Sequence, residues 1–95
     1  METIAINGGG WANASDFYEA YLAAVGAPKW HGRNLDALWD SLTGGGINQR
    51  NPPFRVQISG TSEMGDDARK MVTRFEALIS QARGEGCSVE IALLP

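Results

Sequence analysis

The stretch Phe54-Arg55-Val56-Gln57-Ile58 decides the fold, because apolar and polar residues alternate along it. Such alternation predicts a β-strand with one apolar face and one polar face. A long amphipathic helix follows, starting between Ser62 and Asp66 and ending at Gly84. Its apolar positions recur at spacings of four and three, at Met64, Ala68, Met71, Phe75, Leu78 and Ala82. Residues 88–93 alternate again and predict a last strand.

Toward the N-terminus, the run Thr3–Ile6 is short and rich in β-branched residues, and a glycine-rich turn at residues 7–10 stops it. This pattern predicts a first strand. Apolar and aromatic residues recur every four positions from Ser15 to Val25, which predicts an amphipathic helix closed by Gly26.

A second, shorter helix is expected after Asn34, whose side chain can cap its first turn, and it ends at Gly44. Its apolar stripe consists of Leu35, Leu38 and Leu42. Residues 44–53 are rich in glycine, proline and asparagine, so they predict a connecting loop.

The order of these elements indicates the fold class. Strands separated by helices imply a parallel sheet with right-handed crossovers. Because the second and third strands alternate polar with apolar residues, one face of the sheet is expected to meet water. The sequence therefore predicts an α/β fold of two layers, a three-stranded parallel sheet with helices packed on one face. We expect a single domain over residues 1–95.

The charge balance opposes binding to nucleic acid. The 95 residues include 11 acidic and 8 basic side chains, and the net charge of −3 repels phosphates. We therefore expect a basic protein partner. No apolar run reaches the roughly 18 residues of a membrane helix, and no secretory signal pattern opens the chain. With a single cysteine, Cys87, and no disulfide framework, we expect a cytoplasmic protein that avoids membranes and is monomeric when free.

The motifs of common enzymes and cofactor sites do not occur. The glycine triplets at residues 8–10 and 44–46 lack the Lys-Ser/Thr pair of a P-loop and the GxGxxG spacing, so they predict turns. His31 is the only histidine and has no cysteine cluster to complete a zinc site. No local signature joins His31 to Cys87 or to a serine as a nucleophilic dyad. We expect neither catalysis, nor a cofactor, nor a metal.

The second helix carries an acidic face that stability alone does not require. Asp36 and Asp40 stand four residues apart, so both carboxylates project from one side, opposite the leucine stripe. Like charges at this spacing cost a helix roughly 0.2 to 0.5 kcal/mol. Trp39 lies between them and Trp30 precedes the helix, and aromatic residues around acidic groups are typical of interfaces. The alternatives are a solvated helix face and a carboxylate pair that acts on a glycosidic bond or holds magnesium.

The segment that ends with this helix reads Trp30-His31-Gly32-Arg33-Asn34-Leu35-Asp36-Ala37-Leu38-Trp39-Asp40-Ser41-Leu42-Thr43-Gly44. It resembles the signature segment of the barstar family, intracellular inhibitors of ribonucleases such as barnase. The likeness extends to residues 4–8, to the aromatic first helix and to residues 82–86. It implies the family's fold, a three-stranded parallel sheet with helices on one face, and an inhibitor rather than an enzyme.

The resemblance also implies the roles of individual residues. Asp40 would stand in for the substrate phosphate and meet the arginines and histidine of the nuclease, while Asp36 would pair with a further basic group. Trp30 would pack on the enzyme. The implied partner-binding positions are Trp30, Asn34, Asp36, Trp39, Asp40, Thr43 and Gly44.

Three residues depart from the family pattern. Arg33 stands where the best-known inhibitor has an acidic residue, Gly45 replaces a contact tryptophan, and Gln81 falls where a contacting glutamate is expected. The loop 45–53 is also longer than in that inhibitor. These departures bear on the identity of the nuclease more than on the mode of binding.

Two hypotheses of function follow. The first is a ribonuclease inhibitor that blocks the active site of a small basic ribonuclease with its acidic second helix and the preceding loop. The alternative is a barstar-like immunity or regulatory module, an antitoxin for instance, that binds a different toxin or protein partner. An enzyme that uses Asp36 and Asp40 comes third.

Overall fold

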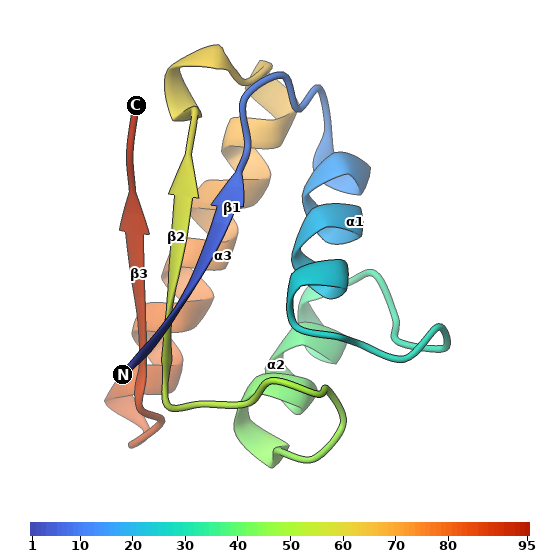
Figure 1. Cartoon of the computed structure of the whole chain (residues 1–95), viewed down its shortest axis with the longest axis vertical. Coiled ribbons are helices and arrows are strands. Elements are labelled where there is room, and N and C mark those ends of the chain that lie inside the picture. Colours follow the sequence, from blue (N-terminus) through green and yellow to red (C-terminus); the bar gives the residue numbers. More distant parts are fainter.

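The computed structural model describes residues 1–95 and contains one sheet with three α-helices (Figure 1). The elements follow in the order β1 (Glu2–Asn7), α1 (Ala14–Ala24), α2 (Leu35–Gly44), β2 (Phe54–Ser59), the 3-10 turn η1 (Thr61–Glu63), α3 (Asp66–Gly84) and β3 (Val89–Leu93). Each predicted strand and helix is present, with ends that differ by a residue or two.

The three strands pair in the order β1-β2-β3, and both pairings are parallel. Val56 at the centre of β2 stands opposite Ile4 of β1 and Ile91 of β3. Helices α1 and α2 lie in the first crossover and α3 lies in the second. The predicted three-stranded parallel sheet of an α/β fold is confirmed.

Only one face of the sheet is buried. On β2, Phe54, Val56 and Ile58 are almost fully buried while Arg55 is exposed, as the alternation predicts. Helices α1 and α3 pack against each other and cover the apolar side of the sheet, with α3 running behind the strands in Figure 1. The buried apolar side chains form one cluster of 21 residues.

An aromatic group sits at the centre of this core. The ring of Phe75 on α3 lies 4.9 Å from the rings of both Phe17 and Tyr21 on α1, measured between centroids. Phe17 and Tyr21 are themselves stacked at 5.7 Å. Burial raises the pKa of the Tyr21 hydroxyl well above its ordinary value, so this side chain stays neutral.

The start of α3 differs from the periodicity of the sequence. Met64 was expected as the first apolar residue of the helix, but it lies in extended backbone before α3 begins at Asp66. The 3-10 turn η1 intervenes because the Arg69 side chain donates to the carbonyls of Thr61 and Ser62 and holds that turn in place. Met64 still joins the core. An apolar residue that continues the spacing pattern of a helix can therefore lie outside that helix.

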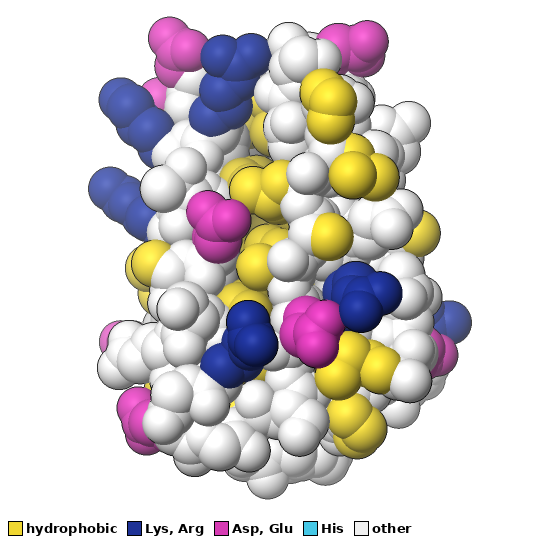
Figure 2. All heavy atoms as spheres, turned by 90° about the vertical axis from the view of Figure 1, so that its left-hand side faces the viewer, with side chains coloured by type: hydrophobic (Ala, Val, Ile, Leu, Met, Phe, Trp, Pro, Cys, Tyr) yellow, Lys and Arg dark blue, Asp and Glu magenta, His cyan; other side chains and the backbone are white.

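The outer edge of β3 is partly open. Ile91 and Leu93 point to the apolar side of the sheet but remain half-exposed, since no further strand or helix covers that edge. Figure 2 shows a band of hydrophobic side chains along this side of the molecule. On the other face, Arg55 and Glu90 form an ion pair at 3.0 Å. None of the helices is both long and apolar enough to cross a bilayer.

Replacing the central aromatic residue tests this account of the core. Phe75→Ala should lower the free energy of unfolding by about 3 to 5 kcal/mol, because it empties a fully buried ring position that contacts two helices. Urea denaturation followed by circular dichroism measures the change. Thr73→Ala, on the exposed side of the same helix, should change stability by less than about 0.5 kcal/mol. Equal effects of the two variants would contradict the proposed core.

Candidate protein-binding site

Helix α2 is attached to the rest of the molecule along one side. Asn34 caps it, because its side-chain oxygen accepts a hydrogen bond from the Ala37 backbone at 2.7 Å. Leu38 and Leu42 are buried, and α2 packs mainly against α3. Asp36 and Asp40 are both exposed. Neither carboxylate has a basic group within 4.0 Å, because both ion pairs of the protein lie elsewhere.

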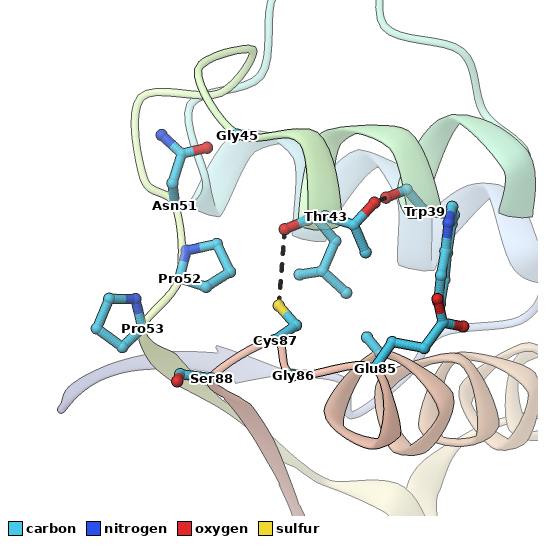
Figure 3. A pocket seen from close by; sticks show the side chains of 12 residues that line it. Trp39, Thr43, Gly45, Asn51, Pro52, Pro53, Glu85, Gly86, Cys87 and Ser88 are labelled. Carbon is cyan, nitrogen blue, oxygen red and sulfur yellow. Dashed lines mark hydrogen bonds between the residues drawn. The ribbon is translucent and has the colours of Figure 1, made fainter.

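Two hollows flank the junction of α2 and α3, and Trp39 lines both of them. The first lies between Asp36 and Trp39 on α2 and the exposed Gln81 on α3. The second lies at the C-terminal end of α2 and extends to the Pro52-Pro53 segment (Figure 3). Trp39 is half-buried, so its ring forms part of the surface at which the two hollows meet.

A buried hydrogen bond holds the loop that precedes α2. The His31 Nδ1 atom lies 2.8 Å from the Gly32 carbonyl, and a carbonyl only accepts, so Nδ1 carries the proton. The other ring nitrogen, Nε2, lies 2.9 Å from the Ser41 hydroxyl oxygen, and that hydroxyl also donates to the Leu38 carbonyl at 3.2 Å. His31 is 8% exposed and Ser41 is 2% exposed. The pair therefore ties the loop to the middle of α2 at a largely buried site.

Two residues of this loop project outward on either side of the buried histidine. Trp30 is 75% exposed, the highest exposure of any large hydrophobic residue. Arg33 is also exposed, and its guanidinium donates to the Ser15 hydroxyl on α1 at 3.4 Å. The anchored loop thus presents one large aromatic side chain and one cation beside the acidic helix.

The far end of α2 is shaped by its C-terminal cap. Thr43 is exposed and donates to the Trp39 carbonyl at 2.8 Å, while Gly44 and Gly45 are exposed and close the helix. Gly45 has φ of +70°, a conformation that favours glycine. A larger residue at this position would be strained.

The loop 45–53 is fixed to the end of α1. The backbone amides of Gln49 and Arg50 donate to the carbonyls of Gly26 and Val25 at 3.2 and 2.9 Å. Within the loop, the Asn51 side chain donates to the Asn48 carbonyl. The longer loop is therefore attached to the body of the protein, and it forms one wall of the second hollow.

Three of the sequence-predicted site residues line the two hollows, Asp40 and Gly44 are exposed on α2 without lining either one, and two residues that sequence reasoning missed join the lining. Asp36, Trp39 and Thr43 line the hollows, whereas Trp30 belongs to the preceding loop and Asn34 acts as the helix cap. The additions are Glu85, which lines the second hollow, and Arg74, which lines the first. Glu85 reaches toward Trp39 in Figure 3. Both lie on or just after α3, at least thirty residues beyond the end of the acidic helix, so only the packing brings them here.

The side chains that could serve catalysis are buried or unreactive in this arrangement. His31 and Ser41 are close enough for a nucleophilic dyad, but both are buried and out of reach of a substrate. Burial raises the pKa of the Cys87 thiol, which disfavours the reactive thiolate. No group of three or more His, Cys, Asp or Glu residues is brought together in a geometry for a metal.

Taken together, a parallel three-stranded sheet covered on one face and an acidic helix at its side define an α/β protein of barstar-like architecture. The chain belongs to the barstar family. The family model described as barstar (barnase inhibitor) matches residues 1–93. The resemblance found in the sequence is thereby confirmed, and membership indicates a role of the barnase-inhibitor type.

The His31–Ser41 hydrogen bond should contribute measurably to stability. Ser41→Ala leaves the Nε2 atom of a buried histidine without a partner, so the free energy of unfolding should fall by about 1 to 3 kcal/mol. Urea denaturation measures the change. Ser80→Ala, an exposed serine on α3, serves as the control and should be neutral. A Ser41→Ala variant as stable as the control would mean that the hydrogen bond does not anchor the loop.

Proposed function

We propose that this protein inhibits a small basic ribonuclease by inserting α2 and the preceding loop into the active site of the enzyme. The observation that carries the proposal is the exposed acidic face of α2, with Asp36 and Asp40 both in solvent and unpaired. Membership of a family described by barnase inhibition supports the same conclusion. The protein acts as a plug and performs no chemistry of its own.

Asp40 takes the central role in this proposal. A carboxylate carries the charge and the acceptor oxygens of a phosphate group, so it satisfies the arginines and histidine that a ribonuclease directs at its substrate. Asp40 lies on the same side of α2 as Asp36, and no basic group of the protein lies within 4.0 Å of it. Nothing within the molecule therefore competes for this carboxylate.

The aromatic residues provide the apolar part of the proposed contact. Trp30 exposes three quarters of its surface to water, so covering it on binding gains roughly 1.5 to 3 kcal/mol from apolar burial. Trp39 lies between the two hollows and adds a half-exposed ring next to the carboxylates. Glu85 extends the acidic surface across the second hollow. Thr43 and Gly44 complete the surface at the end of the helix.

A second candidate is a barstar-like module that binds a different toxin or regulatory protein. The departures at Arg33, Gly45 and Gln81 favour this candidate, because each removes a favourable contact with a strongly basic enzyme. Titration of the protein into barnase and other small ribonucleases, followed by RNA cleavage, separates the candidates. Inhibition of at least one ribonuclease supports the first candidate, and its absence throughout favours the second.

Removing the charge of Asp40 should weaken inhibition strongly. Asp40→Asn should raise the inhibition constant at least about 100-fold, because the basic groups of the active site lose their counter-charge. Inhibition of RNA cleavage at fixed salt measures the effect. Glu76→Gln is the matched control, since Glu76 is exposed and lies about 200° around α3 from Arg74, away from the candidate surface. Undiminished inhibition by Asp40→Asn would rule out the phosphate-mimic mechanism.

Trp30 allows binding to be separated from folding. Trp30→Ala should weaken inhibition by about tenfold or more, since a large apolar contact is lost. Because Trp30 is already 75% exposed, the free energy of unfolding should change by less than about 0.5 kcal/mol. Inhibition assays and urea denaturation on the same preparation give both quantities. A loss of stability without a loss of inhibition would assign Trp30 to the fold instead.

A further inference from the structure

Two cations stand on one flank of the candidate binding surface. Arg74 lines the first hollow together with Asp36, and it lines a second depression with Ala14 at the start of α1. Arg33 reaches the same region from the other side, since its guanidinium contacts Ser15, the neighbour of Ala14. The two arginines therefore lie where the first turns of α1 and α2 meet the middle of α3.

Neither arginine has a carboxylate partner within the protein. The two ion pairs are Arg50 with Glu2 and Arg55 with Glu90, both away from this flank. The contact of Arg33 with the Ser15 hydroxyl is long, at 3.4 Å, and does not neutralise its charge. Both guanidinium groups are exposed and free to meet an external group.

The positive charge of this flank also extends along the surface. Burial raises the pKa of the Tyr18 hydroxyl on α1, and the positive charge of Arg74 partly offsets that rise. Arg74 therefore acts electrostatically on α1 as well as on α2. Lys70, one turn earlier on α3, lines the same depression as Arg74. The candidate surface thus has an acidic face on α2 and, beside it, a flank that carries the cations Arg33, Lys70 and Arg74, with Asp67 placed among them.

A partner that is basic all over does not fit such a surface. Seating α2 in a basic active site would bring Arg33 and Arg74 against the rim of that site, and like charges in contact oppose association. We propose that the partner carries carboxylates on one rim of its basic cleft, where they pair with Arg33 and Arg74 and set specificity. This inference rests on the proposed inhibition of a ribonuclease. It adds that the inhibited enzyme has acidic residues at the rim of its basic active site.

Nucleic acid is a less suitable occupant of the basic flank. A nucleic-acid strand would continue past the arginines to Asp36 and Asp67, which oppose a continuous row of phosphates. A few carboxylates on a protein rim need to approach only Arg33 and Arg74. The net charge of −3 opposes phosphates further. Bidentate pairing with protein carboxylates suits the two arginines better.

Reversal of the two charges tests the proposal. Inhibition constants are measured for the protein and for the double variant Arg33→Glu/Arg74→Glu against two probes, barnase and a small ribonuclease of net negative charge. The double variant should bind the acidic ribonuclease at least about tenfold more weakly and barnase about tenfold more tightly. Arg83→Glu is the control, because Arg83 lies on the opposite flank of α3, beside Val89 and Glu90, and should shift neither constant more than about twofold.

The outcomes separate this proposal from the inhibitory function itself. If the protein inhibits a ribonuclease and the double variant keeps both constants within about twofold, the arginines do not set specificity and only this proposal fails. If Asp40→Asn leaves inhibition intact, the phosphate-mimic mechanism of inhibition fails instead. A gel shift of single-stranded RNA that the double reversal abolishes would assign the flank to nucleic acid and overturn the proposal. Failure of the protein to inhibit these two ribonucleases and every other small ribonuclease titrated would overturn both.

Discussion

The structure depends on the burial of a single face of a small parallel sheet. Three parallel strands need two crossovers, and the helices α1 and α3 of these crossovers are sufficient to cover the apolar side. Phe75 joins the two helices at the centre of that layer. Because α1 and α3 already cover the sheet, α2 packs mainly against α3. An exposed helix face is thus a consequence of the topology, and the acidic residues occupy it.

An exposed helix is useful for binding only if its surroundings are ordered, and several local interactions provide that order. Asn34 fixes the start of α2, and the His31–Ser41 hydrogen bond fixes the preceding loop to its middle. Ordering a flexible loop on binding costs affinity, so a loop that is already held in place loses less free energy when the partner arrives. The hydrogen bonds of Asn34 and of the His31–Ser41 pair therefore hold the binding surface in place without contacting the partner themselves.

Much of the fold could be predicted from the sequence because its signals are local. Alternation in residues 54–58 gave β2 its correct buried face, and the asparagine and glycine at the ends of α2 marked its limits. Met64 was misplaced because an apolar residue before a helix can reach the same core as the helix. The pairing of Asp36 and Asp40 on one side also followed from helical spacing alone.

The rest of the candidate surface could not be predicted because it is assembled by packing. Glu85 and Arg74 reach α2 only through the contact between α2 and α3, and nothing in their local sequence indicates that contact. The link between His31 and Ser41 joins a loop to a helix ten residues later, and neither residue has a motif. The family resemblance predicted the residues at the centre of the surface. The charged residues at its edges were found only in the three-dimensional structure.

The C-terminal end of α2 and the loop that follows it are fixed by successive backbone interactions. Gly45 takes a positive φ to close the helix, and a large side chain is disfavoured in that conformation. The chain then enters the longer loop, whose amides at Gln49 and Arg50 bind the end of α1. The rim of the second hollow at this end of α2 is therefore formed by glycine backbone and by Pro52 and Pro53, and Trp39 is the one aromatic residue that lines the hollow.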